Sequence, residues 1–135
     1  MENTDFTKFE QESEMANKHS VAVISKFEEW LIAKGLGDKT VKGHVQNITF
    51  FAHNYLNRHE ITPIEDSIME VPLFIEGYFI PKCMWSSKSS IKENIASFNK
   101  FYGYLAEIEA VLLKDARILK QILKEDQASW FRMVR

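Results

Sequence analysis

The chain reads WSSKSSIKENIASFNKFYGYL over residues 85–105, and this stretch decides the fold class. Its large apolar side chains recur at intervals of three or four residues, which places them on one face of an α-helix. They are Ile91, Ile95, Phe98, Tyr102 and Leu105. Residues 86–90 supply several serines, whose hydroxyls can accept hydrogen bonds from the unpaired N–H groups of a first helical turn. The stretch therefore predicts a long helix with one buried face.

The same periodicity continues on the N-terminal side. A first helix is predicted from about Lys18 to a stop at Gly35, and a second begins at Asp38, which can cap it. The apolar stripe of the first helix consists of Val21, Ile24, Phe27, Trp30 and Leu31. The stripe of the second consists of Val41, Val45, Ile48, Ala52, Tyr55 and Leu56.

Prolines divide the middle of the chain into short segments. Residues 62–65 read TPIE, a capping box with proline at the first helical position, and predict a short helix. Pro72 allows a new helix over residues 73–80, which Pro81 ends or bends. Ala116, Leu119, Leu123 and Trp130 predict a last helix, with Ile118 and Ile122 widening its apolar stripe.

Composition agrees with a single helical domain. The chain has 135 residues, of which 45% are hydrophobic and 27% charged, the balance of one globular unit with a core of its own. Only five glycines and three prolines are present, which favours long helices over a turn-rich β-fold. We therefore predict an all-α fold, a compact bundle of four to five helices over residues 18–135. Residues 1–17 are predicted to form an acidic, mobile arm.

The cysteine content and the hydropathy of the chain indicate its cellular compartment. Cys83 is the only cysteine, so no disulfide can form within the chain, and a lone thiol fits a reducing compartment. No run approaches the ~18 apolar residues that a membrane span needs. The sequence predicts a cytoplasmic protein without a membrane partner.

Charge is segregated along the chain although its net value is only -2. Residues 1–38 hold eight acids against four lysines, and residues 60–81 hold five acids and no base. Residues 39–59 hold three bases and no acid, and residues 82–104 hold four lysines against Glu93. If the fold brings the two basic segments together, they make a positive face.

The usual catalytic and ligand-binding patterns are missing. No two of the four histidines are three or four residues apart, so neither a metal nor another cofactor is predicted. Residues 89–92 and 97–100 match Ser-x-x-Lys, but the companion motifs of serine acyl enzymes are missing. No glycine-rich phosphate loop is present. We predict that the chain is not an enzyme.

Two stretches resemble one family of DNA-binding domains. Residues 27–51, FEEWLIAKGLGDKTVKGHVQNITFF, resemble the opening helices of the core-binding domain of tyrosine recombinases, the SAM-like N-terminal domain of phage integrases. The family positions are matched by Leu36, Asp38, Thr40 and His44. Residues 85–105 are similar to a later helix of that domain, which closes on an aromatic pair followed by leucine. The positions matched there are Ile91, Phe98, Phe101, Tyr102 and Leu105.

The resemblance, which covers residues 18–107, implies a helical bundle that grips duplex DNA, with two helices approaching the major groove. The two basic segments coincide with these two helices. Polar residues off their apolar stripes can reach phosphates or base edges. The candidate DNA-binding residues are Lys39, Thr40, Lys42, Gln46, Ser87, Lys88, Lys92 and Asn99, with Lys100 as a weaker candidate. The expected partners are double-stranded DNA and either a recombinase or a second copy of the chain.

The chain departs from the recombinase pattern at its C-terminal side. The family cleaves DNA with a tyrosine nucleophile in a separate domain, and nothing in these residues resembles that domain. We therefore expect a non-catalytic DNA-binding module, either a free-standing relative of the DNA-gripping half or a fragment that stops before the catalytic half.

Two other interpretations are open. Residues 37–48 resemble the recognition helix of the helix-turn-helix in bacterial response regulators, although only a tight connection precedes them. The alternative outside DNA binding is a helical protein–protein interaction module that uses exposed aromatic residues. Trp85, Trp130 and Phe131 are the candidates for that surface.

Overall fold

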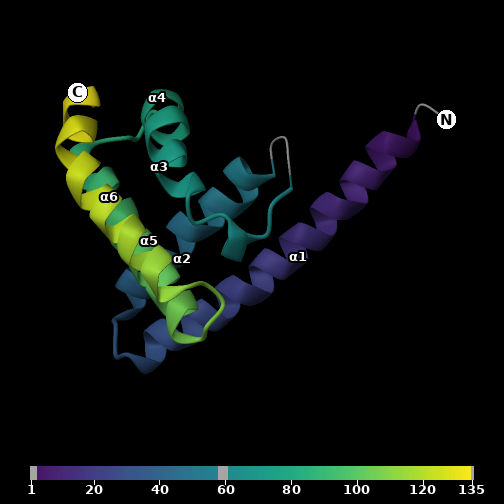
Figure 1. Cartoon of the computed structure of the whole chain (residues 1–135), viewed down its shortest axis with the longest axis horizontal. Helices are drawn as coiled ribbons and strands as arrows, with labels where there is room; N and C mark the ends of the chain where they lie inside the picture. The colour runs from purple at the N-terminus through teal and green to yellow at the C-terminus, as the bar shows by residue number, and fades with distance from the viewer. Residues whose placement is uncertain (1–2, 58–60, 135) are drawn as a thin grey trace.

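The computed structural model describes residues 3–57 and 61–134, with side chains described from residue 7 onward. Within these residues every regular element is helical, which confirms the predicted all-α bundle (Figure 1). The elements are α1 (Asn3–Ala33), α2 (Asp38–Phe50), the π-helical η1 (Phe51–Leu56), the 3-10 turn η2 (Ile64–Asp66), α3 (Glu70–Phe74), the π-helical η3 (Ile75–Phe79), α4 (Ile80–Lys82), α5 (Lys88–Glu107) and α6 (Leu113–Met133). Arg58, His59 and Arg135 lie outside the described residues.

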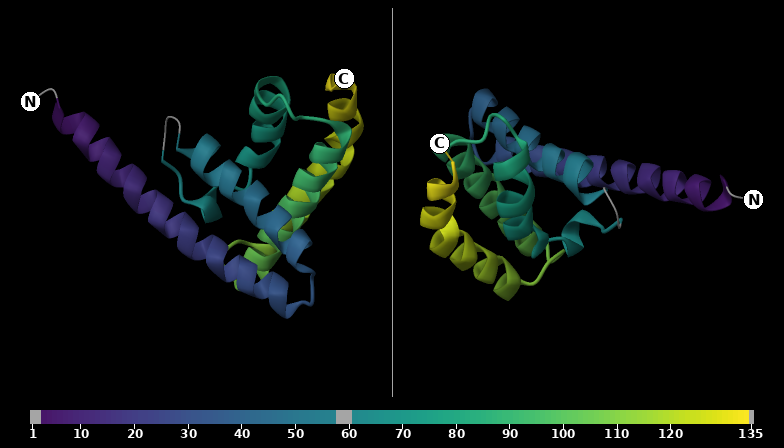
Figure 2. Two further views of the ribbon diagram at one scale, coloured as in Figure 1. Left: turned by 180° about the vertical axis from the view of Figure 1, so that it is seen from behind. Right: turned by 90° about the horizontal axis from the view of Figure 1, so that it is seen from above.

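Helix α5 is the centre of the bundle. It packs against α1, α2 and α6, and α6 runs back along it as the second arm of a helical hairpin (Figures 1 and 2). All five apolar residues predicted for its inner face are buried. Ser87 caps its first turn in a reciprocal pair with Ser90, as the run of serines predicted.

The core around α5 is rich in aromatic rings. Phe98 is fully buried, and its ring lies edge-on to Phe51, with 4.9 Å between centroids, and to Phe74, at 5.8 Å. The Tyr102 hydroxyl donates a 2.9 Å hydrogen bond to the carbonyl of Ile64 and so fastens η2 to α5. Burial raises the pKa of Tyr102 well above its ordinary value, which keeps this donor protonated.

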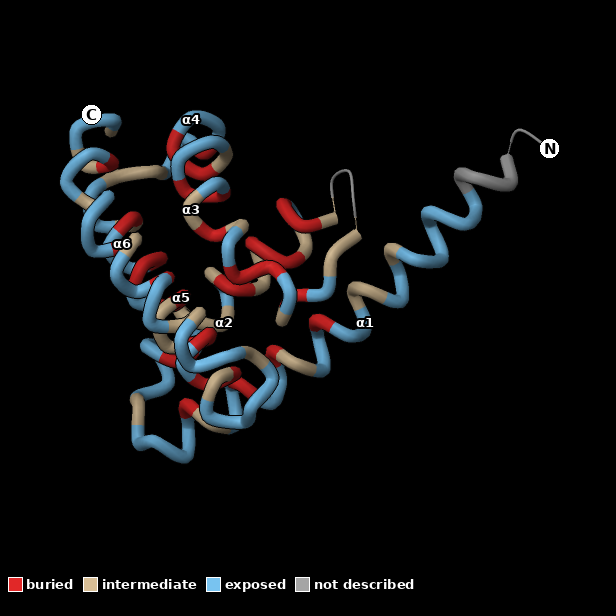
Figure 3. The backbone as a smooth tube through the Cα atoms, viewed as in Figure 1, coloured by how far each residue is buried: buried red, intermediate tan, exposed pale blue. Residues whose placement is uncertain are grey.

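Helix α1 begins at Asn3, so the predicted start near Lys18 is wrong. Residues 1–34 contain neither glycine nor proline, and once the C-terminal part of α1 is packed each added residue extends an existing helix without a new nucleation cost. The N-terminal half of α1 projects from the bundle and is mostly exposed (Figures 1 and 3). Val21 also proves to be exposed, outside the buried stripe.

The two predicted caps upstream of α5 are not formed. Asp38 is the first residue of α2 rather than its cap, and Gly37 occupies the cap position without a side-chain hydrogen bond. In the TPIE stretch Pro63 takes the cap position with an extended backbone, so the turn starts at Ile64 and the predicted capping box does not form. The carbonyl of Pro63 instead accepts a hydrogen bond from Ser67 Oγ at 2.8 Å.

The segment from α3 to α4 begins earlier than predicted. It starts at Glu70, which leaves Pro72 within the first turn, where the missing N–H of proline removes no helical hydrogen bond. Pro81 is accommodated within α4 because the preceding turn η3 is π-helical, and its wider spacing relieves the clash of a proline ring with the preceding turn. The helix then ends at Lys82, close to the predicted stop.

Helix α6 buries Leu119, Leu123 and Trp130, as its spacing predicted. Ile118 is exposed, so the stripe is narrower on that side than expected. No helix in the described part of the chain has both the length and the apolar character to cross a membrane.

Candidate nucleic-acid interface

The two helices that the resemblance assigns to DNA lie side by side. Ser97 on α5 is fully buried between them, and its Oγ lies 2.7 Å from His44 Nδ1 on α2. The same oxygen accepts a 2.9 Å hydrogen bond from Asn47 Nδ2. A serine that accepts from Asn47 and donates to a neutral His44 uses its hydroxyl both as acceptor and as donor, and the two bonds hold α2 in register against α5.

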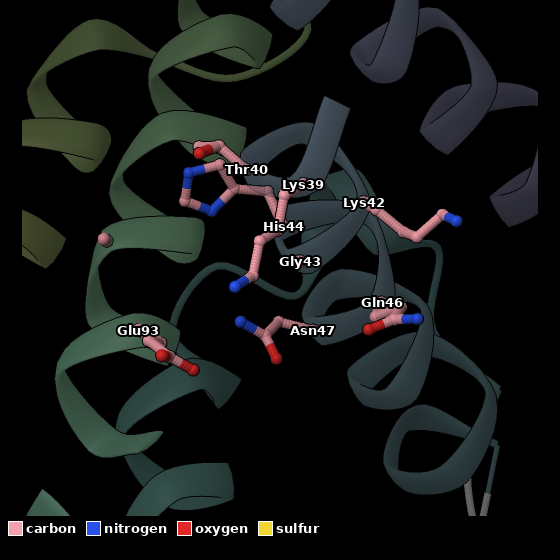
Figure 4. A pocket seen from close by; sticks show the side chains of 9 residues that line it. Lys39, Thr40, Lys42, Gly43, His44, Gln46, Asn47 and Glu93 are labelled. Atoms are coloured by element: carbon pink, nitrogen blue, oxygen red, sulfur yellow. The ribbon is translucent and has the colours of Figure 1, made fainter. Parts of the chain in front are cut away.

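An open groove of about 460 Å³ runs along this seam (Figure 4). We refer to it as the α2–α5 groove. Its lining residues are Lys39, Thr40, Lys42, Gly43, His44, Gln46 and Asn47 from α2, with Glu93 and Ala96 from α5. In Figure 4 the Lys39 side chain runs toward Asn47 and Glu93, whereas Lys42 points away from α5. All four candidate DNA-binding residues of α2 therefore gather at one groove, and all four are exposed.

The candidate residues of α5 are distributed differently. Lys88 is exposed at the first position of α5, and the Ser87 hydroxyl is already used as the cap of that helix. Lys92 leans toward α6, where its Nζ lies 5.6 Å from the centroid of the Phe131 ring. Asn99 is half-buried, and its Oδ1 has no hydrogen-bond partner among the described residues. The α5 candidates thus lie away from the α2–α5 groove, across the outer face of α5.

Electrostatics connect Lys100 to the groove. Burial lowers the pKa of His44 below its ordinary value, the positive charge of Lys100 lowers it further, and the negative charge of Glu93 opposes both. Lys100 therefore lies within electrostatic reach of His44, although it does not line the groove.

Sequence reasoning missed the role of Ser97 and Asn47. Their only signal is a polar residue at a helical position that faces inward, a pattern that can indicate a buried hydrogen bond between helices. His44 was named only because it matches the family pattern, and the structure places it at the contact between α2 and α5.

We expect His44 to make stability depend on pH. Since its pKa in the folded protein is lowered, the unfolded chain binds more protons below the ordinary histidine pKa of about 6.5. The free energy of unfolding is then highest above about pH 6.5 and declines as the pH falls toward the pKa of His44 in the folded protein. Denaturant titrations at about pH 7.5 and about pH 5.5 check this. The decline should be smaller in H44Q, and an equal decline in both proteins contradicts the assignment.

Among the described residues no three histidine, cysteine, aspartate or glutamate side chains are grouped so as to hold a metal ion. The groove instead presents ammonium and amide groups, which bind phosphates and base edges. No family model matches the chain, and neither does any curated protein or any solved structure.

Proposed function

We propose that this chain is a non-catalytic DNA-binding module of the kind its sequence resembles, the core-binding domain of a phage integrase. The observation that carries the proposal is the packing of α2 against α5, which leaves an open groove lined by Lys39 and Lys42 of α2. The two helices come from segments far apart in the sequence, and in both segments bases outnumber acids. A double helix offers a regular array of negative phosphates to such a surface.

The groups at the α2–α5 groove differ in what they can bind. Lysine ammonium groups bind phosphates and set the position of the protein on the duplex. Gln46 is exposed and carries a side-chain amide, which can pair with an adenine edge in the major groove. Glu93 would repel phosphates, but a carboxylate can accept a hydrogen bond from the amino group of cytosine. The groove therefore fits a duplex in which bases, rather than a phosphate, face Glu93.

A duplex titration at two salt concentrations tests this function. We expect the wild type to bind non-specific duplex with a Kd of about 10⁻⁴ to 10⁻⁶ M near physiological salt, and more tightly at about 50 mM than at about 200 mM. K39E/K42E should bind about tenfold more weakly or worse at the lower salt, because two phosphate contacts are replaced by repulsion.

The matched control is K8E/K18E, which makes the same charge change at two exposed positions on α1. Fluorescence anisotropy of a labelled duplex measures the binding, and far-ultraviolet circular dichroism verifies that the helices persist. Equal affinities for K39E/K42E and K8E/K18E would contradict the proposal.

That outcome would favour the second candidate, a helical protein-interaction module. Its support is the exposure of three apolar side chains on α3 and just after α4, where Leu73 is 58% exposed, Trp85 60% and Met84 fully exposed. Trp130 is buried and Phe131 is half-buried, so of the three aromatic residues first considered only Trp85 is largely exposed, and its ring also packs against Phe50 and Phe79. Apolar side chains at this level of exposure are typical of surfaces that contact another protein.

A further inference from the structure

We propose that α6 carries a second phosphate-binding row for duplex DNA, made of Arg117, Lys120 and Lys124. We call these residues the α6 basic row. The inference rests on the proposed function and extends it, because the resemblance to the recombinase domain ends before α6 and assigns that helix no contact.

One contact fixes how the outer faces of α5 and α6 meet. The Lys92 ammonium lies over the Phe131 ring, so the side of α6 that carries Phe131 borders the outer face of α5. Helix α2 forms the other border of α5, because Glu93 and Ala96 of α5 line the groove between the two helices. The exposed strip of α5 therefore lies between α2 and α6.

Helical periodicity places the α6 basic row on that same side. At about 100° per residue, Lys120 and Lys124 lie within about 20° of Phe131 around the helix axis, and Arg117 within about 40°. All three are exposed. The acidic residues of α6 lie about 120–160° from Phe131 by the same geometry. They are Asp115, Glu125 and Asp126.

The antiparallel hairpin aligns the row with polar and small residues of α5. Starting from the contact of Lys92 with Phe131, two turns along each helix lead to Asn99 on α5 and Lys124 on α6. Another turn leads to the neighbourhood of Gly103 and Lys120. Gly103 is exposed and adds no side chain, and Asn99 is half-buried, with its side-chain oxygen shielded from solvent. These α5 positions therefore add little bulk beside the α6 basic row.

The two sets of basic residues flank one strip of surface. Helices α2 and α6 border α5 on different sides, and long lysine side chains can extend from each of them toward a backbone of a duplex that lies across this strip. Lys39 and Lys42 would then bind one backbone while the α6 basic row binds the other.

The test compares three charge-reversal pairs on one labelled duplex. We expect K120E/K124E to weaken binding about tenfold at about 50 mM salt relative to K8E/K18E. The milder K120Q/K124Q should reduce the slope of log K against log salt by about 1 to 2, since each lost phosphate contact contributes about 0.9. Circular dichroism of every variant verifies that the fold persists.

The outcomes separate this inference from the proposed function. If K39E/K42E weakens binding while K120E/K124E and K120Q/K124Q behave as the α1 control does, the α6 basic row is refuted and the α2–α5 interface stands. If neither K39E/K42E nor K120E/K124E differs from the control, the proposed function itself fails. If K120E/K124E weakens binding and K120Q/K124Q leaves the salt slope unchanged, direct phosphate contact by the row is also refuted.

Discussion

Replacing Phe98 with alanine is expected to lower the free energy of unfolding by about 3–5 kcal/mol, the usual cost of truncating a buried phenylalanine. Phe98 is fully buried and lies edge-on to Phe51 and Phe74, so one ring joins α5 to η1 and α3. Its removal leaves a cavity at the place where three segments meet, and the rigid surroundings can fill it only in part. Denaturant titration measures the effect as a lower midpoint with an unchanged slope.

Phe98→Leu is the control for that experiment. Leucine retains most of the apolar volume and loses the edge-on ring contacts, so we expect a smaller loss of about 1–2 kcal/mol. A domain of this size has about 5–15 kcal/mol of stability in total, so the alanine variant will lie near the limit of folding. An alanine variant as stable as the wild type would mean that Phe98 is not at the centre of the core.

Replacing Trp130 with alanine is expected to cost a similar amount, about 3–5 kcal/mol. Trp130 is the largest fully buried side chain, at 1% exposure, and its indole N–H donates a 3.2 Å hydrogen bond to Glu76 Oε1 on η3. The residue thus anchors the end of α6 to a segment far away in the sequence. Thermal and denaturant unfolding followed by circular dichroism measure the loss.

Two variants divide the Trp130 effect into its parts. Trp130→Phe retains most of the buried area without the N–H donor, and Glu76→Gln retains the acceptor without its charge. We expect Trp130→Phe to cost about 1 kcal/mol, the usual net value of one hydrogen bond, and Glu76→Gln to cost less because the bond can persist. If Trp130→Phe were as destabilising as Trp130→Ala, the hydrogen bond rather than the buried area would contribute most of the stabilisation by Trp130, which would contradict the prediction.

The helical core could be predicted to a large extent from the sequence. The apolar residues of 85–105 recur at helical spacing, and the structure buries all five of them. The Ser87 cap and the buried positions Leu119, Leu123 and Trp130 follow from the same local rules. These predictions succeed because a helix with one apolar face has few other ways to remove that face from water.

Helix boundaries were less predictable because they depend on small energies. A side-chain cap contributes only about 1 kcal/mol, so the extended backbone of Gly37 can replace the expected Asp38 cap. The early start of α1 reflects weak propensities summed over many residues, which no single residue signals. The π-helical turns η1 and η3 depend on how neighbouring side chains pack, and no motif indicates them.

For the candidate site, the sequence by itself determined that positive charge is concentrated in two segments and that both are helices with an apolar stripe, since charge and periodicity are properties of the chain alone. Only the tertiary structure decided which charges share a surface. It placed Lys39 and Lys42 along a groove between α2 and α5, whose contact Ser97 makes with His44 and Asn47, and it turned Lys92 toward Phe131 on α6. The physical reason is that the rotation of one helix against another depends on side chains that meet across the core, and those contacts are absent until the chain has folded.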